Sequence, residues 1–131
     1  MTAGLVILLV EDNPGDVLLL ETAFAAAGHD VQLQVASTVR AALGALSERR
    51  YGLVVIDIRL AGTDGWEVLE SLSGNALYAG TPAAVLTSSS RADDRARARA
   101  LGTENYFIKP LGVDGYRQIV DALVGLHRGA R

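Results

Sequence analysis

Cysteine is absent from this sequence of 131 residues, which excludes disulfides and thiolate metal sites and suits a cytoplasmic protein. Long apolar runs are absent too, because the run over 5–10 is too short for a membrane span or a secretory signal. The formal net charge of −3 argues against nucleic acid and anionic membrane surfaces as partners. Lysine is almost absent, since every one of the 12 basic residues except Lys109 is an arginine.

The length and composition predict a single domain over residues 1–131. Hydrophobic residues make up 50% of the chain, which argues against disorder, and 131 residues suffice for one core but not for a second unit. No period of roughly 20 to 50 residues repeats, and no low-complexity linker interrupts the sequence. We also expect no output domain, because the chain ends a few residues beyond its last predicted helix.

The stretch over 53–65 carries the most informative pattern. Four apolar residues, three of them β-branched, run without a polar break and stop at Asp57. So short an apolar run predicts a strand buried on both faces, as in a parallel sheet. Ligands of open α/β sheets bind at the carboxyl ends of strands, where Asp57 would lie. An aspartate taken alone is also a common turn residue, so its interpretation as a nucleophile depends on its neighbours.

Helices and strands are predicted to alternate along the whole chain. The predicted strands lie at 5–10, 31–35, 53–57, 83–86 and 105–108, and the predicted helices at about 14–27, 38–50, 66–72, 92–101 and 113–127. Five strands alternating with five helices predict right-handed crossovers and an α/β fold, a parallel sheet with helices on both faces. The flavodoxin-type strand order 2-1-3-4-5 is the usual arrangement for five such units.

Local signals add detail to this outline. Asn13 followed by Pro14 predicts a capped helix start, and Ser37 is the expected cap of the next helix. Leu18 projects away from the apolar face of its helix, which makes it a candidate docking residue for a partner. The helix over 92–101 has mostly alanine on its apolar side. It therefore buries little apolar area, and we expect it to be the most loosely held.

Acidic residues follow two predicted strands that would be neighbours in this order. Strands in a sheet lie about 4.8 Å apart, so Glu11, Asp12 and Asp57 would converge at one edge of the sheet. Three close carboxylates repel one another unless a cation lies among them. Mg²⁺ is the best candidate, because it prefers oxygen ligands and takes one or two carboxylates together with waters. The lack of cysteine and the distant histidines disfavour zinc.

Thr87 and Lys109 complete the predicted site. Thr87 ends the fourth strand, where its hydroxyl can reach an oxygen attached to Asp57. Lys109 ends the fifth strand, about 10 Å of backbone separation away, which a lysine side chain can largely bridge. Pro110 follows it directly and is a candidate for a cis peptide bond that fixes the direction of the lysine.

Together these side chains predict a phosphoryl-transfer site. Such a site needs a metal ion to neutralise charge and a second cation or donor on the remaining oxygens. Asp57 would attack phosphorus and become an acyl phosphate. No residue is placed as a strong general base, so we expect slow hydrolysis and no dedicated enzyme activity. The product would be a stored signal.

The chain resembles, over essentially its whole length, the receiver domain of two-component response regulators. The residues that carry the resemblance are Glu11-Asp12, Asp57 with the turn Asp64-Gly65 behind it, Thr87, and Tyr106 with Lys109-Pro110. The resemblance implies that Asp57 accepts phosphate from a histidine kinase and that Lys109 pairs with the phosphoryl group. The Mg²⁺ ligands that it implies are Glu11, Asp12, Asp57 and the backbone carbonyl of Arg59. Thr87 and Tyr106 would form the conformational switch.

The opening Val-Glu-Asp-Asn-Pro-Gly-Asp over 10–16 is similar to single-domain regulators that partner phytochrome-type histidine kinases. Members of that group often form homodimers through the last helices and strand. The apolar stripe of the last predicted helix agrees with this, because Val124 and Leu126 widen it beyond one sheet contact. Two positions depart from the family: Ala61 stands where proline is usual, and Thr103 where alanine is usual. Both departures concern loop rigidity.

Three other functions share parts of this pattern. A Mg²⁺-dependent phosphohydrolase of the haloacid-dehalogenase type also uses a strand-end aspartate, but it needs a second aspartate where Arg59 stands. A flavodoxin needs a phosphate cradle in its first loop, where Glu11 and Asp12 would repel phosphate. A receiver-like binding module that is never phosphorylated would be recognised by the loss of an acid, the threonine or the lysine, and none is missing.

Overall fold

The computed structural model describes residues 4–60 and 63–129, so the departure at Ala61 lies outside the described residues. The strands are β1 (Leu5–Val10), β2 (Val31–Ala36), β3 (Leu53–Ile56), β4 (Ala83–Thr87) and β5 (Tyr106–Ile108). The helices are α1 (Pro14–Ala26), α2 (Val39–Glu48), α3 (Trp66–Ser73), α4 (Ala92–Ala100) and α5 (Val113–Gly129), with a short 3₁₀ helix η1 (Ala76–Tyr78) before β4.

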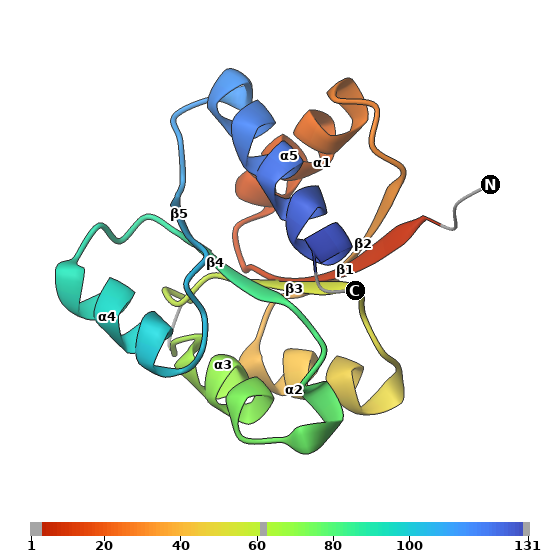
Figure 1. Ribbon diagram of the computed structural model, residues 1–131. Helices are drawn as coiled ribbons and strands as arrows, with labels where there is room; N and C mark the ends of the chain where they lie inside the picture. Colours follow the sequence, from red (N-terminus) through yellow and green to blue (C-terminus); the bar gives the residue numbers. More distant parts are fainter. Residues whose placement is uncertain (1–3, 61–62, 130–131) are drawn as a thin grey trace.

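The five strands form one parallel sheet in the order β2-β1-β3-β4-β5, as the sequence predicts. Helices α1 and α5 cover one face, and α2, α3 and α4 cover the other (Figure 1). Because all strands run in the same direction, their carboxyl ends meet at one edge of the sheet. That edge holds the residues that follow β1, β3, β4 and β5 in the sequence.

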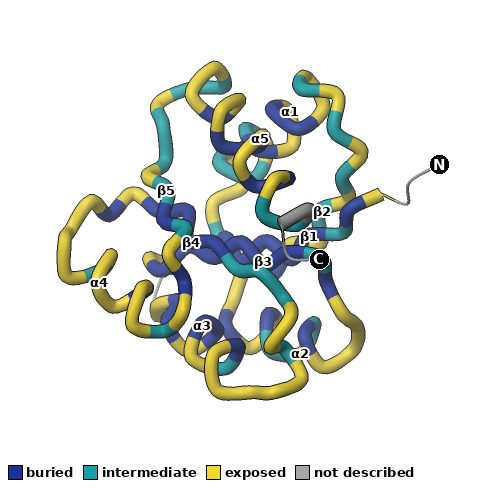
Figure 2. The backbone as a smooth tube through the Cα atoms, viewed as in Figure 1, coloured by how far each residue is buried: buried dark blue, intermediate teal, exposed yellow. Residues whose placement is uncertain are grey.

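Alternating side chains of the central strands fill two separate cores. In β3, Leu53 and Val55 face α1 and α5, whereas Val54 and Ile56 face α2 and α3, and all four are 0% exposed. Figure 2 shows these strands as the buried middle layer between helices that are exposed on their outer sides. Burial on both faces explains why the run is uniformly apolar. It also fixes the end of β3 firmly in space.

The ends of the helices mostly follow the predicted signals. The Asn13 side chain accepts backbone N–H bonds in the first turn of α1, and Gly28, with φ of 76°, follows the end of this helix. The predicted cap at Ser37 is wrong. Thr38 has the extended backbone that a cap requires, and its hydroxyl accepts the N–H of Ala41 at 3.0 Å.

Exposure tests three further expectations. Leu18 is 63% exposed, as predicted. In α4 only Ala98 is buried, which confirms the thin apolar contact of this helix. Val124, by contrast, is only 7% exposed and belongs to the core under α1 and α5. The stripe on α5 is therefore wide partly because the monomer buries it, so Val124 gives no support for a dimer surface.

Two remaining observations concern Pro110 and the membrane. Across residues 4–60 and 63–129 every peptide bond is trans, so the cis bond considered before Pro110 is not formed. The helices of this described part are all too short or too polar to cross a membrane.

Candidate functional site

Asp57 lies at the carboxyl edge of the sheet, directly after β3. Its backbone N–H donates to the carbonyl of Val10 at 2.9 Å, which extends the pairing of β3 with β1 by one residue. The side chain is 3% exposed, and its Oδ1 accepts the backbone N–H of Arg59 at 2.8 Å. One carboxylate oxygen is thus held by the loop, and the other points toward the remaining site residues.

Lys109 reaches this carboxylate from β5. Its backbone N–H donates to the carbonyl of Thr87 at 2.8 Å, which fixes the start of the side chain beside β4. Its Nζ lies 2.7 Å from an oxygen of each of three carboxylates, those of Glu11, Asp16 and Asp57. The lysine stem therefore bridges from β5 to β3, as the sequence predicts, and all three ammonium hydrogens have acceptors.

The ammonium of Lys109 is held in its charged form. Burial opposes the charge, but hydrogen bonds to the carboxylates of Asp16, Asp57 and Glu11 outweigh it and raise the pKa of Lys109 above its ordinary value. The side chain is only 13% exposed. Lys109 is therefore a fixed positive charge at neutral pH, directed at Asp57.

Glu11 is the second buried carboxylate of the site, with 3% of its surface exposed. Its Oε1 contacts Lys109, while its Oε2 accepts the backbone N–H groups of Asp12 and Asn13, both at 3.1 Å. Burial raises the pKa of Glu11, and the bond to Lys109 offsets only part of that rise. The folded protein therefore holds this negative charge at a cost in free energy.

The balance of charge at this edge fits a divalent cation. Three carboxylates share one ammonium, which leaves an excess of two negative charges. The nearby donors are oxygen atoms, the ligands that Mg²⁺ prefers. Within residues 4–60 and 63–129, no group of three or more acidic or histidine side chains is preassembled around a metal position. Mg²⁺ does not require one, because it binds through one or two carboxylates and keeps several waters.

Thr87 is the last residue of β4, and Tyr106 is the first residue of β5. Thr87 is 0% exposed at the end of β4, and its hydroxyl oxygen lies 3.4 Å from the backbone nitrogen of Ser89. The Tyr106 ring is turned inward, 7% exposed, and its hydroxyl donates to the carbonyl of Ser89 at 2.9 Å. The guanidinium of Arg95 lies 4.7 Å from the centre of the ring. The tyrosine is thus held by a hydrogen bond at its hydroxyl and by a cation–π contact at its ring.

Two sets of contacts were not predicted. Asp16, in the first turn of α1, is the third carboxylate on Lys109. Its distance of three residues from the cap Asn13 was the available signal, since this position lies on the first turn next to the sheet edge. The other set joins the Arg59 guanidinium, the Asp94 carboxylate and the Ser89 hydroxyl. These side chains come from two loops and a helix, and their contacts give no periodic signal in the sequence.

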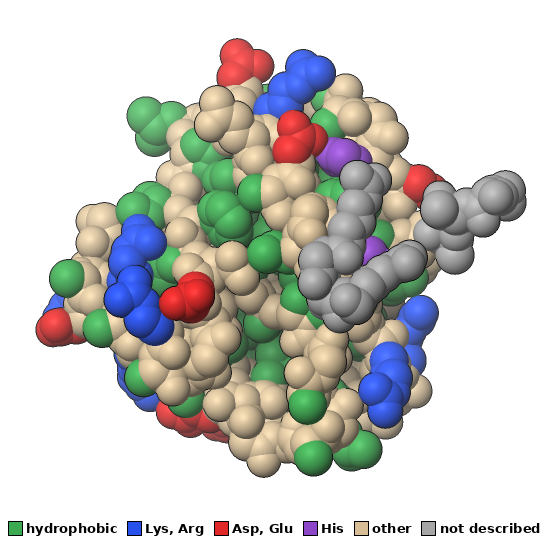
Figure 3. Space-filling model, in the orientation of Figure 1, with side chains coloured by type: hydrophobic (Ala, Val, Ile, Leu, Met, Phe, Trp, Pro, Cys, Tyr) green, Lys and Arg blue, Asp and Glu red, His purple; other side chains and the backbone are tan. Residues whose placement is uncertain are grey.

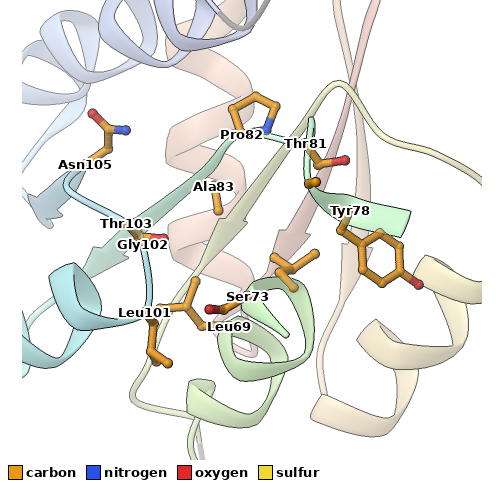
Figure 4. A pocket seen from close by; sticks show the side chains of 12 residues that line it. Leu69, Ser73, Tyr78, Thr81, Pro82, Ala83, Leu101, Gly102, Thr103 and Asn105 are labelled. Atoms are coloured by element: carbon orange, nitrogen blue, oxygen red, sulfur yellow. The ribbon is translucent and has the colours of Figure 1, made fainter. Parts of the chain in front are cut away.

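A pocket of about 310 Å³ lies at the opposite edge of the sheet, where β4 and β5 begin. Its walls are apolar or small polar side chains from α3, η1 and the loops before β4 and β5, and Figure 4 shows Leu69, Tyr78, Pro82 and Thr103 among them. It contains none of the predicted site residues. Thr103, the second departure from the family pattern, is 5% exposed here and remote from the acids.

Comparison with known proteins agrees with this geometry. A family model described as the response regulator receiver domain matches residues 7–121. This chain belongs to the response regulator receiver domain family. Asp57, Thr87 and Lys109 lie at or directly after the ends of β3, β4 and β5, and the strand order is that of the flavodoxin-like fold.

Curated relatives include longer proteins. The receiver is 32% identical over 124 residues to the probable methanogenesis regulatory protein FilR2 of Methanothrix harundinacea, covering 90% of this chain and 80% of that protein. It is 34% identical over 112 residues to the transcriptional regulatory protein TcrA of Mycobacterium tuberculosis, covering 86% of this chain. The match spans only 43% of TcrA, so the relative contains more than the region shared with this receiver.

Solved receiver structures match nearly the whole chain. The phosphorylated cyanobacterial phytochrome response regulator RcpA is 25% identical, with a TM-score of 0.86, over 98% of this chain and 97% of that one. The Mn²⁺-bound form of response regulator Rcp1 is 28% identical, with a TM-score of 0.80, over 90% of each chain. Both matches cover at least 90% of this chain.

Proposed function

We propose that this receiver is a phosphoacceptor switch, in which Asp57 accepts a phosphoryl group from a histidine kinase. One observation carries the proposal: Asp57 Oδ2 lies 2.7 Å from Nζ of Lys109 at the carboxyl edge of the sheet. A buried carboxylate beside a permanent positive charge is suited to attack phosphorus while the charge on the transferred group is neutralised. All 131 residues form one receiver domain in this proposal.

The transfer exchanges one bond for another. An oxygen of Asp57 bonds to phosphorus, the bond from phosphorus to the kinase histidine breaks, and the imidazole nitrogen keeps the electron pair. Lys109 pairs with a phosphoryl oxygen and neutralises part of the negative charge that the phosphoryl group brings to Asp57. The Arg59 N–H already holds Oδ1 of Asp57, so we assign the attack to the other oxygen, Oδ2, which accepts from Lys109 before the transfer.

Mg²⁺ is the proposed cofactor. Its ligands would be Glu11, Asp12, Asp57 and the backbone carbonyl of Arg59, and the excess negative charge at these acids supports the assignment. When bound, the ion neutralises charge on the transferred phosphoryl oxygens. The Mn²⁺-bound relative Rcp1 provides independent support, because its fold matches this chain.

Phosphorylation would change the partner surface through Thr87 and Tyr106. The phosphoryl group adds negative charge and acceptor oxygens, and the buried Thr87 hydroxyl lies at the neighbouring strand end to meet them. Movement of Thr87 alters the space beside the inward ring of Tyr106. The α4 helix follows because it has one buried residue, Ala98, on the core. Such a switch works in the cytoplasm, where the kinase takes its phosphoryl group from ATP.

A phytochrome-type histidine kinase is the proposed donor, and a second copy of the chain is a proposed partner. The likeness to RcpA supports the kinase type. A homodimer would use β5 and α5, because Ile108 of β5 is 41% exposed and Leu111, in the loop between β5 and α5, is fully exposed. Figure 3 shows hydrophobic atoms on this side, next to the basic side chains over α4. We expect native mass spectrometry to detect a dimer that the substitution Leu111→Asp abolishes.

Labelling with acetyl phosphate and Mg²⁺ tests the acceptor. The intact mass should increase by one phosphoryl group, and hydroxylamine should remove it, as it does from acyl phosphates. Asp57→Asn should abolish the labelling. Asp64→Asn is the matched control, because Asp64 lies in the same loop but bonds only the Trp66 N–H among the contacts described. Persistent labelling of the Asp57→Asn variant would overturn the assignment of Asp57.

The same assay separates the switch from a phosphohydrolase. An enzyme would release inorganic phosphate continuously and accumulate little labelled protein, whereas the switch holds its group for a useful time. The position two residues after Asp57, where such enzymes need a second aspartate, is held by Arg59. We therefore expect no dedicated enzyme activity. A binding module that is never phosphorylated would show no mass change under any donor.

A further inference from the structure

Asp16 holds the same ammonium that the proposed reaction uses. It lies in the first turn of α1, and its Oδ2 is 2.7 Å from Nζ of Lys109, as close as the oxygens of Glu11 and Asp57. The Asp16 side chain is 25% exposed, against 13% for Lys109, so the pair lies at the margin of the buried site. The backbone N–H of Asp16 donates to the cap Asn13, which fixes where α1 presents the carboxylate.

The three carboxylates on Lys109 differ in what else they must do. Asp57 is the proposed acceptor, so its contact with Lys109 must change when an oxygen bonds to phosphorus. Glu11 is a proposed metal ligand, so a bound cation draws its charge away from the lysine. Asp16 has neither duty and is fixed by helix α1. Of the three, it is the one that can remain on the ammonium through the whole cycle.

Helix α5 lies beside α1 on the same face of the sheet (Figure 1). Tyr116 of α5 is 0% exposed, and burial, followed by the negative charge of Asp16, raises the pKa of its hydroxyl to about 12. Tyr116 therefore stays neutral, and the charges of Asp16 and Lys109 both act on its hydroxyl.

We propose that Asp16 is a positioning residue for Lys109, holding the ammonium against α1 so that it meets the phosphoryl group in one fixed orientation. The inference rests on the proposed role of Asp57 as acceptor. A charge-assisted bond lost from a flexible side chain lowers the population of the productive rotamer by about tenfold. The loss should appear in the maximal rate of labelling at saturating phosphodonor, and only weakly in the concentration for half-saturation.

Because Lys109 is the only lysine in the sequence, its ammonium can be observed directly. Protein labelled with ¹⁵N at the lysine side chain gives one ammonium signal by nuclear magnetic resonance. In the native chain we expect this signal to be sharp, since three carboxylates slow the exchange of its hydrogens with water. Asp16→Asn should shift and broaden it, and should slow labelling by acetyl phosphate about tenfold. Asp16→Glu should recover part of both.

Glu21→Gln is the matched control. It removes one negative charge from the same helix, at an exposed position that makes no described contact with Lys109. It should leave the lysine signal and the labelling rate unchanged. If Asp16→Asn slows labelling without moving the lysine signal, or Glu21→Gln has the same effect, Asp16 acts only through overall charge and the inference is wrong. An unchanged rate in Asp16→Asn also overturns it.

The two proposals fail in different ways. If the native chain is not labelled by any phosphodonor, the acceptor function is wrong, whatever the lysine signal shows. If the native chain is labelled and the signal of Lys109 is indifferent to Asp16→Asn, the acceptor function stands and the positioning role is rejected.

Discussion

Arg59 and Asp94 form an ion pair of 2.8 Å that joins the loop after β3 to helix α4. The same oxygen of Asp94 accepts the Ser89 hydroxyl at 2.5 Å, so the three residues form what we call the α4 clamp. The hydrogen bond from Ser89, together with Arg59, lowers the pKa of Asp94 against the opposing effect of burial. Because α4 has little apolar contact with the core, polar contacts of this kind hold it in place.

Asp94→Asn should loosen α4. The pair itself contributes little, since Arg59 is half exposed to solvent, but with the Ser89 bond we expect a loss of about 1 kcal/mol in the free energy of unfolding. Amide hydrogen exchange should accelerate in α4 more than elsewhere. Asp93→Asn, at a 92% exposed side chain one residue away, should change neither quantity.

The clamp should also respond to acid. The folded pKa of Asp94 lies below its usual 3.8, so its contribution is complete above pH 3.8 and is lost as the pH falls through the folded value. Urea unfolding from pH 6 down to acid should therefore show a shallower decline for Asp94→Asn than for the native chain. An equally steep decline in both would show that the clamp contributes nothing.

Glu11→Gln should stabilise the protein at neutral pH when divalent cations are chelated. The folded pKa of Glu11 lies above 4.5, so its contribution to stability is present below pH 4.5 and is lost as the pH rises through the folded value. Glutamine mimics the neutral form, and its advantage should disappear toward pH 4.5. With Mg²⁺ added, calorimetry should show weaker binding to the variant, because a proposed ligand has lost its charge.

Two tyrosines should respond oppositely to the same change. Among the described residues the hydroxyl of Tyr116 has no hydrogen-bond partner, so Tyr116→Phe should raise the free energy of unfolding by about 1 kcal/mol. Tyr106→Phe removes the bond to the Ser89 carbonyl and should lower it by about the same amount. Thermal and urea unfolding of both variants measure this difference. Destabilisation by Tyr116→Phe would show that its hydroxyl is satisfied in solution.

Alanine substitutions at two glycines should have opposite effects on the free energy of unfolding. A Cβ at Gly65 would collide with the carbonyl oxygen of Asp57 and the side chain of Ile56, so Gly65→Ala should displace the acceptor loop. It should cost more than about 1 kcal/mol and slow labelling of Asp57. Gly44 lies in α2 with open space around it, so Gly44→Ala should stabilise the helix by roughly 0.5–1 kcal/mol. Labelling should not change in that control.

The fold and the main site could be predicted because both follow from the strands. A strand buried on both faces is a continuous apolar run, and the residue after it lies at the sheet edge whatever the loops do. Asp57 follows such a strand, whereas Lys109 follows the edge strand β5, where Ile108 is exposed, and the two residues are in contact. The strand order predicts which strand ends are adjacent, and the lysine side chain is long enough to span from β5 to β3.

The sequence does not predict the features for which small energies decide between neighbouring residues or rotamers. Ser37 and Thr38 are both good caps, and the backbone angle at Thr38 chooses between them. Asp16 is one polar residue on a helix, and only the rotation of α1 directs it at Lys109. The pairing of Arg59 with Asp94 depends on two side chains from separate segments, which local sequence does not specify.

The side chain of Lys109 and the position of helix α4 are fixed from opposite faces of the sheet. Asp16 holds Lys109 from the side of α1 and α5, whereas the α4 clamp acts on the other face. Arg59 serves both groups, because its backbone N–H holds Asp57 and its guanidinium pairs with Asp94, whereas Asp16 contacts only the first group and Asp94 only the second. In related proteins, substitutions around Lys109 could change how long the phosphoryl group persists without changing the partner that binds. Substitutions in α4 could change the partner without changing that lifetime.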